Sequence, residues 1–484
     1  MTWGRGLAAM VLTAALATGC SSSVAGEAVS PLYDPFRVGG LPAVDGPSGI
    51  REDAPEPVGT VDNTDGADVD RLAVLAVDDV TEFWSQHYAD ALPGEFEPVE
   101  KLMSFDSNDP ASPWVCGGRT YRLVNAFFCP PLALLAWDRG VMVPVARKFF
   151  GDMSVVALIA HEYGHAVQRM AGLIDKDTST LVIEQQADCF AGAHQRWVVE
   201  GNSPRFTLDT GDGLNHVLAA ALTVRDPLMP AIVAELLDVD EHGNALDRIS
   251  AFQLGFINGA QTCAAIDDQE VRQRRGDLPR SLELGDDGTV QSGDMAIDES
   301  VLAALMGDLD AIFLLSDPPT LSLDPRECAG PQPGTPVAYC PDGNVLGVDL
   351  PALQRFAAPA SELRNLVLLQ GDNTALSALT SRYVLAVQRE REVALDTAEA
   401  ALRTACLTGF AQQAMAEPVP GRQLVLTAGD VDEAVAGLLV NGIVASNVTG
   451  ATVPAGFTRI VAYRSGLLGD PELCYTRFGR AGNG

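Results

Sequence analysis

Lysine is scarce in this chain of 484 residues, and positive charge as a whole is in deficit. Lys101, Lys148 and Lys176 are the only lysines, so arginine supplies nearly all of the basic charge. Acidic residues number 64 against 32 basic ones, which gives a formal net charge of −32. Nucleic-acid binding needs a basic face, so this deficit argues against it. The charge instead predicts a soluble surface that repels copies of itself.

The apolar run near the N-terminus, Leu7 to Ala17, is too short to cross a membrane as a folded helix. It follows Arg5 and ends in LATGC at residues 16–20, a pattern that resembles a bacterial lipobox. We therefore expect residues 1–19 to be a lipoprotein signal peptide and Cys20 to be lipidated. The predicted location is extracytoplasmic, with the lipid anchor in the cell membrane. The alternative is an ordinary secretory signal peptide with a bystander cysteine.

The other eight cysteines form an even set, which in an exported chain predicts disulfide bonds. They are Cys116, Cys129, Cys189, Cys263, Cys328, Cys340, Cys406 and Cys474. Their number alone does not fix the connectivity, because eight cysteines allow 105 pairings.

Length favours two to four domains. Residues 20–66 are rich in Pro, Gly, Ser, Val and acidic residues without a sustained period, which predicts a flexible tether. The charged, poorly patterned residues 276–294 are the linker candidate, so we place the two folded domains at 67–275 and 295–484.

Hydrophobic spacing in the first domain predicts several helices and one strand. The strand covers 132–137, and the helices cover 67–92, 144–150, a stretch from Ser154, a stretch from Thr180, 215–224 and 230–237. Residues 248–263 close this unit. Ser154 is the expected N-cap of its helix.

The stretch VVALIAHEYGHAVQR, residues 155–169, contains the HExxH pattern. His161 and His165 lie one turn apart on one face of a helix, where both can bind the same zinc ion. Glu162 is then placed to act as the general base toward a zinc-bound water. A surface helix with two histidines is the alternative. The apolar flanks, together with Gly164 in the helix interior, argue against it because they indicate close packing.

A catalytic zinc site needs a third protein ligand. Glu184 is the best candidate, since it lies 19 residues after His165 on the next predicted helix. Asp188 follows one turn later on the same face, where it can accept the free ring N–H of a ligand histidine. The oxyanion-stabilising residue stays open between His216 and Tyr163, with neither favoured.

HEYGHAVQ, EQQADCFAG and GFINGAQTC, together with the Cys116–Cys129 segment and Pro130, resemble the motifs of the bacterial neutral zinc metallopeptidase family. The resemblance covers about residues 66–275. With the lipobox, the chain is similar to actinobacterial, mycobacterial-type lipoprotein peptidases. The resemblance implies a zincin-like fold with Glu184 as the third ligand. Ala166 stands where that family often has a further histidine, but it replaces no ligand.

The C-terminal part resembles the first domain in outline. Residues 375–389 align with 155–169 and residues 459–474 with 248–263, both without gaps, and each half carries four cysteines in the same order. We favour an internal duplication over an unrelated helical domain. The overall prediction is a mostly helical α+β fold, with a zincin-like domain followed by a degenerate second copy.

The second copy lacks the chemistry of the first. His161, Glu162, His165, Glu184 and Asp188 align with Ser381, Arg382, Leu385, Ala401 and Ala405. A repeated cysteine pairing favours the bridges Cys116–Cys129, Cys189–Cys263, Cys328–Cys340 and Cys406–Cys474. The second half is therefore predicted to be a pseudo-peptidase domain that packs on the first, shapes the cleft or binds a protein partner.

The function predicted from these residues is that of a lipid-anchored zinc endopeptidase that cleaves peptide or protein substrates with a zinc-activated water. The alternative from another class is a non-catalytic binding or scaffold lipoprotein of the cell envelope with a vestigial or structural metal site. Intact Glu162 argues against the alternative, because a structural zinc has no use for a general base. An amidase acting on envelope peptides would use the same site.

Overall fold

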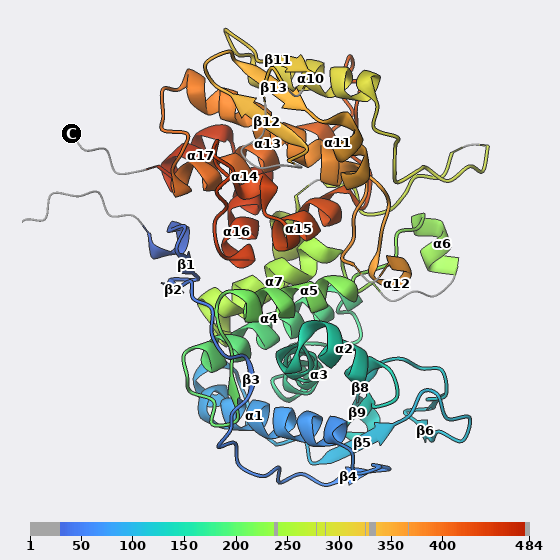
Figure 1. Cartoon of the computed structure of the whole chain (residues 1–484). Helices are drawn as coiled ribbons and strands as arrows, with labels where there is room; N and C mark the ends of the chain where they lie inside the picture. The colour runs from blue at the N-terminus through green and yellow to red at the C-terminus, as the bar shows by residue number, and fades with distance from the viewer. Residues whose placement is uncertain are drawn as a thin grey trace, which may run out of the picture.

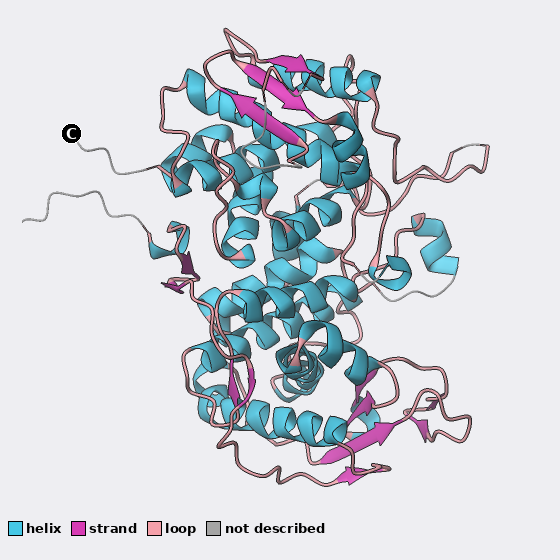
Figure 2. Cartoon of the chain, viewed as in Figure 1, coloured by secondary structure: helices cyan, strands magenta, loops and turns pink. Residues whose placement is uncertain are grey.

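The computed structural model describes residues 30–236, 241–276, 278–285, 287–324, 326–328, 335–365 and 367–479. The predicted signal peptide and Cys20 lie outside these ranges. Helices dominate and the strands are short (Figure 2), so the chain is a mostly helical α+β protein. Within the described ranges, no helix combines the length and the apolar character needed to span a membrane.

The first half contains a four-stranded sheet and a group of helices (Figure 1). In spatial order the strands are β4 (Val61–Asp62), β5 (Lys101–Phe105), β9 (Leu134–Asp138) and β8 (Ala126–Cys129). β4, β5 and β9 are parallel, and β8 runs antiparallel to β9 at the edge. The helices are α1 (Asp68–Ala91), α2 (Met142–Phe150), α3 (Asp152–Met170), α4 (Thr180–Val199), α5 (Asp212–Thr223), α6 (Ala231–Leu236), α7 (Ala245–Asn258), α8 (Ala260–Cys263) and α9 (Asp268–Arg275).

The second half has a three-stranded sheet with the order β11 (Thr320–Ser322), β13 (Val345–Val348) and β12 (Val337–Cys340). β11 is parallel to β13, and β12 is antiparallel to it. Its helices are α10 (Glu299–Phe313), α11 (Leu350–Phe356), α12 (Glu362–Asn365), α13 (Asp372–Glu390), α14 (Ala398–Ala416), α15 (Asp430–Val440), α16 (Gly456–Leu467) and α17 (Pro471–Arg477). In each half, one strand therefore has a parallel neighbour on one side and an antiparallel neighbour on the other. This strand is β9 in the first half and β13 in the second.

The prediction of a flexible tether over residues 20–66 is wrong for the described residues from 30 onward. The chain there forms β1 (Arg37–Val38), β2 (Leu41–Pro42) and β3 (Gly49–Ile50) before it enters β4. β3 pairs with β10 (Phe206–Thr207), and the Ser48 hydroxyl donates to Asp209. Two-residue strands are too short to show a period, and the partner of β3 lies far along the chain, so composition alone was misleading.

A second correction concerns the start of the central helix. Helix α3 begins at Asp152 and not at Ser154. Gly151 has a φ of 79°, a conformation that suits glycine and separates α2 from α3. The Ser154 hydroxyl donates to the carbonyls of Gly151 and Ala146 and so does not serve as the N-cap.

Close helix crossings recur in the two halves. A Cβ atom at Gly192 of α4 would collide with the carbonyl oxygen of Phe252 in α7, and one at Gly255 would collide with that of Cys189. In the second half, α14 and α16 cross in the same way. There, a Cβ atom at Gly409 would collide with the carbonyl oxygen of Tyr463, and one at Gly466 would collide with that of Cys406. The same pairing of glycine with carbonyl therefore brings two helices together in each half.

Four disulfides join cysteines of the described chain. They are Cys116–Cys129, Cys189–Cys263, Cys328–Cys340 and Cys406–Cys474. Each lies within one half, and these are the pairs that the cysteine register favours. The bridges from Cys189 and Cys406 start at the helix crossings and tie them to α8 and α17.

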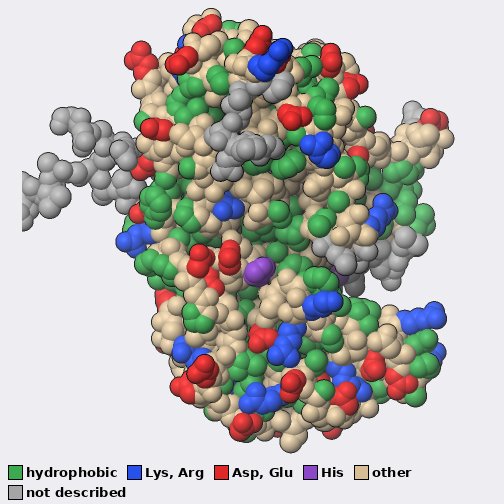
Figure 3. Space-filling model, viewed as in Figure 1, with side chains coloured by type: hydrophobic (Ala, Val, Ile, Leu, Met, Phe, Trp, Pro, Cys, Tyr) green, Lys and Arg blue, Asp and Glu red, His purple; other side chains and the backbone are tan. Residues whose placement is uncertain are grey.

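The two halves stack on one another with α5 and α7 facing α15 and α16 (Figure 1). Phe256 packs on Phe457 with ring centroids 5.0 Å apart, and Gln253 donates to the Phe457 carbonyl at 2.9 Å. One hydrophobic core extends through both halves. On the face shown in Figure 3, acidic side chains lie over both halves, with basic ones between them rather than gathered in one patch.

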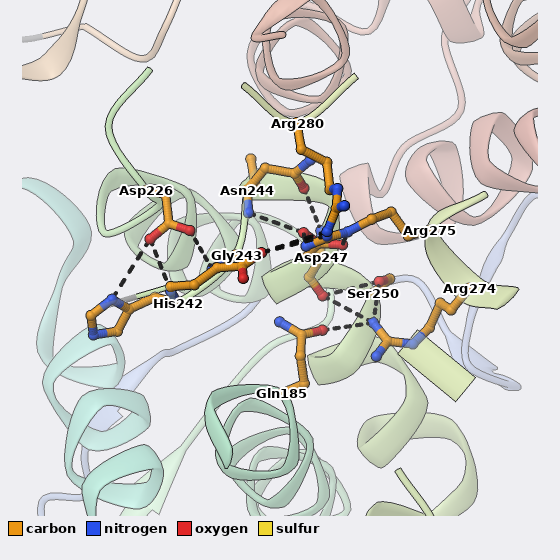
Figure 4. A network of polar contacts seen from close by, with 12 residues as sticks. Gln185, Asp226, His242, Gly243, Asn244, Asp247, Ser250, Arg274, Arg275 and Arg280 are labelled. Atoms are coloured by element: carbon orange, nitrogen blue, oxygen red, sulfur yellow. Dashed lines mark hydrogen bonds and ion pairs between the residues drawn. The ribbon is translucent and has the colours of Figure 1, made fainter. Parts of the chain in front are cut away.

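The segment after α8 is more ordered than its charged composition predicts. In α9, Arg274 and Arg275 are buried and reach the start of α7 (Figure 4). Arg275 forms an ion pair with Asp247, and Arg274 donates to Gln185 Oε1 and Ser250 Oγ at 2.8 and 2.7 Å. These contacts hold α9 against α4 and α7, so the first half extends at least to Arg275.

Candidate metal centre

The centre is built where α3 crosses α4. A Cβ atom at Gly164 would lie 3.1 Å from the Cα of Ala187, so glycine allows the two backbones to approach closely. This is the packing that the sequence predicted for Gly164. The crossing brings His161, His165 and Glu184 together, with one possible ligand atom from each within 4.8 Å of the others.

Both histidines direct a ring nitrogen toward the same carboxylate. His161 Nε2 lies 3.2 Å from Glu184 Oε2, and His165 Nε2 lies 3.5 Å from Glu184 Oε1. Three side chains with lone pairs therefore converge on one point, and all three are largely buried. Two imidazoles and a carboxylate form a donor set that is typical of catalytic zinc sites.

The opposite ring nitrogens are fixed by hydrogen bonds. His161 Nδ1 lies 2.8 Å from Asp188 Oδ1, and His165 Nδ1 lies 3.0 Å from Gln168 Oε1. Gln168 is oriented in turn, because its amide nitrogen donates to the Ile183 carbonyl at 2.6 Å. Each histidine thus donates through Nδ1 and keeps the Nε2 lone pair for a metal.

Arg248 of α7 is a site residue that the sequence did not reveal. Its guanidinium donates to Asp188 Oδ1 at 2.8 Å and to the Val224 carbonyl at 3.0 Å. Burial would raise the pKa of Asp188, but Arg248 and His161 lower it. Asp188 therefore stays ionised while it holds His161. A lone arginine 60 residues downstream of Asp188 carries no local pattern, so only the fold identifies it.

The electrostatics of the ligand group suit a cation. Burial and the neighbouring His161 lower the pKa of His165 to about 4. Burial would raise the pKa of Glu184, but His161 lowers it well below its usual range. Burial would lower the pKa of His161, yet Asp188 and Glu184 raise it overall. A metal that replaces the His161 proton would be held by the Glu184 carboxylate and two imidazoles, and its affinity would depend on pH.

An unsatisfied carboxylate oxygen is a further reason why these residues fit a zinc ion. Glu184 Oε2 is buried and accepts no hydrogen bond, although His161 Nε2 lies at ion-pair distance. A buried carboxylate oxygen without a hydrogen bond costs free energy unless a cation pairs with it. The donor set contains two imidazoles, which favours zinc over the oxygen-preferring calcium and magnesium ions.

Glu162 lies beside this group and faces the sheet. Its Oε2 accepts a hydrogen bond from the Phe128 N–H of β8 at 3.1 Å. Burial raises the pKa of Glu162 to about 7, with His161 acting in the opposite direction. The carboxyl group is therefore anchored at one oxygen next to the edge strand of the sheet.

The other candidates from the sequence lie elsewhere. The Tyr163 hydroxyl is occupied by Thr81 and by the Val99 N–H, in the core between α1 and α3. His216 is exposed on α5. Neither belongs to the group of ligand atoms.

At the aligned positions of the second half, the structure has a different arrangement. Arg382 of α13 is buried and donates to the carbonyls of Ile443, Ser446 and Asn447. Ser381 donates to the Ala378 carbonyl of its own helix. A guanidinium bound to backbone carbonyls takes the place of the ligands, so this location cannot hold a divalent cation.

Comparison with known proteins points to the same region of the chain. Residues 51–266 match the model of a family described as "Putative neutral zinc metallopeptidase". Uncharacterized protein YpfJ of Escherichia coli K12 is 29% identical over 161 residues, which are 29% of this chain and 54% of that protein. Uncharacterized protein Rv2575 of Mycobacterium tuberculosis H37Rv is 26% identical over 212 residues, which are 40% of this chain and 70% of that protein.

The similarity is confined to part of each sequence. The chain spans about half the length of the Escherichia coli relatives, 54% in each case. No solved structure matches the chain significantly. The matched residues include the whole ligand group, Glu162 and Arg248. Residues 51–266 are therefore similar to the putative neutral zinc metallopeptidase family.

Proposed function

We propose that this protein is a lipid-anchored, extracytoplasmic zinc endopeptidase. The observation that carries the proposal is the buried convergence of His161, His165 and Glu184, with Glu162 next to them. Peptide substrates are what the family assignment implies. The position of β8 at the edge of the sheet supports this choice, because β8 borders Glu162 and an extended peptide can pair with such an edge.

Each residue has a defined role in the proposed reaction. Zinc held by His161, His165 and Glu184 would supply a Lewis acid and a water that ionises near neutral pH. Glu162, anchored through Oε2, would take the proton of the attacking water on its other oxygen and deliver it to the leaving amine. Asp188 would keep His161 in the tautomer that leaves Nε2 free.

We further infer that the second half is a duplicated copy that lost its metal site. The matching strand pairings and glycine crossings support the inference. So does a shared contact of the motif glutamines: Gln168 donates to the Ile183 carbonyl, and Gln388 donates to the Ala400 carbonyl at the aligned position. The proposed limits are 67–275 for the peptidase domain and 295–484 for the degenerate copy. Its proposed roles are to support the first half and to offer a surface to a protein partner.

The extracytoplasmic location rests on two features. Four disulfides are typical of proteins from oxidising compartments. The lipobox-like residues 16–20 place a cysteine where a signal peptidase would cleave. Lipidation of Cys20 would then hold the chain at the membrane surface.

Substitution of Glu162 tests the activity. We expect Glu162→Ala to abolish peptide cleavage, a loss of at least about 1,000-fold, because the proton acceptor is missing. Bound zinc, measured by metal analysis, should remain near the wild-type level because all three ligands stay. Cleavage of a peptide library is the readout, and exposed Glu100→Ala is the matched control. Wild-type cleavage by Glu162→Ala would favour the binding or scaffold alternative.

A further inference from the structure

A second group of carboxyl side chains lies in the other half of the molecule. Asp294 is on the segment that leads into α10, Asp372 begins α13, and Asp430 and Glu433 lie in the first turn of α15. Oxygen atoms of Asp294, Asp372 and Glu433 lie within 4.8 Å of one another. Asp430 lies close to this group, because the charge of Asp372 raises the pKa of Asp430 and the charge of Asp430 raises the pKa of Glu433. We refer to these four residues as the acidic cluster.

Backbone amides hold one oxygen of each buried member. Asp372 Oδ2 accepts from the Met295 N–H at 3.0 Å, and Glu433 Oε2 accepts from the Asn373 N–H at 2.9 Å. Asp430 Oδ2 accepts from the Thr427 N–H. One oxygen of each of these three carboxyl groups is therefore fixed in place by a backbone amide.

Two of the other oxygens in these groups are orphaned. Asp372 Oδ1 and Asp430 Oδ1 are buried and have no hydrogen-bond partner, in residues that are only 2% and 4% exposed. A buried polar atom without a partner is costly, and for a carboxylate oxygen the cost is greater. Such atoms call for a bound group.

A glycine keeps the space between the carboxyl groups clear. A Cβ atom at Gly371 would collide with Glu433 Oε1 and with Asp294 Oδ1. The φ of Gly371 is −169°, so the backbone itself does not need glycine there. Its role is to let these two oxygens approach from opposite elements.

The described residues supply no cation to this cluster. None of the ion pairs in the described ranges includes any of its four members. Burial raises the pKa of Asp372 to about 6 and that of Asp430 to about 8, and it raises the pKa of Glu433 well above its usual range. The negative charges of the four carboxylates therefore repel one another, and either bound protons or an external cation must offset this repulsion.

We propose that the acidic cluster is a calcium site, with Asp294, Asp372 and Glu433 as ligands and Asp430 beside them. The donors are all carboxylate oxygens, which suits a hard cation and gives no imidazole or thiolate for zinc. Calcium accepts irregular carboxylate cages, whereas magnesium demands octahedral geometry and retains water. Asp294 is exposed, which provides a route for entry. The ion would fasten the segment between the halves to α13 and α15.

Calcium binding is testable on the full-length, zinc-loaded protein. Calcium titrated into protein that was dialysed against calcium-free buffer at pH 7.5 should raise the Tm by about 3–8 °C, with half of the effect near 10⁻⁴ to 10⁻³ M. Isothermal calorimetry would give the affinity directly. Asp294→Asn removes an exposed ligand without disturbing the core and should weaken calcium binding at least about 10-fold. Glu433→Gln should abolish it.

The controls separate calcium binding from neutralisation of the cluster by protons or by magnesium. Asp267→Asn, an exposed acid outside the cluster, should respond to calcium as the wild type does. No rise in Tm at about 10 mM calcium, with Asp294→Asn identical to wild type, would show that protons neutralise the cluster and would overturn the proposal. A larger response to magnesium than to calcium would overturn it as well. The result is independent of peptide cleavage, so it stands or falls apart from the proposed function.

Discussion

Helices α3 and α13 carry sequences that align with one another, yet only α3 has histidine ligands at the aligned positions. Both contain an Ala-Val-Gln-Arg sequence near their C-terminal end, and in both the glutamine donates to the neighbouring long helix. In α3 the residues at the crossing are His161 and His165, whereas in α13 Arg382 fills the place with hydrogen bonds to carbonyls. The comparison separates what this helix needs to pack from what it needs to react.

The aligned arginines sharpen the point. Each arginine donates to a backbone carbonyl that precedes it in the chain. Arg248 donates to Val224, just after α5, and Arg459 donates to Leu438 in α15. Arg248 also holds Asp188, but the position aligned with Asp188 is Ala405 in the second half. One arginine therefore serves packing in both halves and has an additional task in only one.

The largest predicted effect breaks the shared packing. Gly192→Ala and Gly409→Ala should each destabilise the protein by about 3 kcal/mol or more, because the added methyl group would collide with a helix carbonyl. Chemical denaturation followed by circular dichroism measures the effect. Gly307→Ala is the control, since that glycine is exposed in α10 and alanine should stabilise the helix by up to about 1 kcal/mol. Tolerance of either crossing substitution would argue against equivalent crossings.

A smaller effect is expected from the residue that distinguishes the halves. Asp188→Asn should lower zinc affinity about 10- to 100-fold, because the amide holds the His161 ring less firmly and leaves Arg248 without a charge partner. Competition with a chromogenic chelator measures that affinity. Asp308→Asn is the matched control, since Asp308 is a buried carboxylate of the second half that accepts from the backbone of Gln423 and Leu424. The zinc affinity of the Asp308→Asn variant should equal that of the wild type.

Much of the first half could be predicted from the sequence. The periodic helices α1 and α4 begin within a residue of their predicted starts, because a long amphipathic or buried pattern fixes a helix. The ligand group followed from the spacing of His161, His165 and Glu184 on two helices. Residues 248–263, which the sequence predicts only to close the first domain, lie in two helices, because Gly259 with a φ of 81° separates α7 from α8.

The features that escaped the sequence depend on distant partners. β3 gains its pairing from β10, and α9 is held by the ion pair of Arg275 with Asp247. The role of Arg248 arises only once α7 lies against α4. The acidic cluster likewise assembles residues from three separate segments of the chain, so no local pattern indicated it.

Zinc content tests the central claim most directly. The claim is that the first half alone holds zinc and that the second half has lost its site. Metal analysis of the full-length protein, dialysed with calcium present to occupy the acidic cluster, should give one zinc per chain. The double variant His161→Ala/His165→Ala should contain none, and Arg382→Ala should still contain one. Two zinc ions per wild-type chain, or zinc retained by the double variant, would contradict the account.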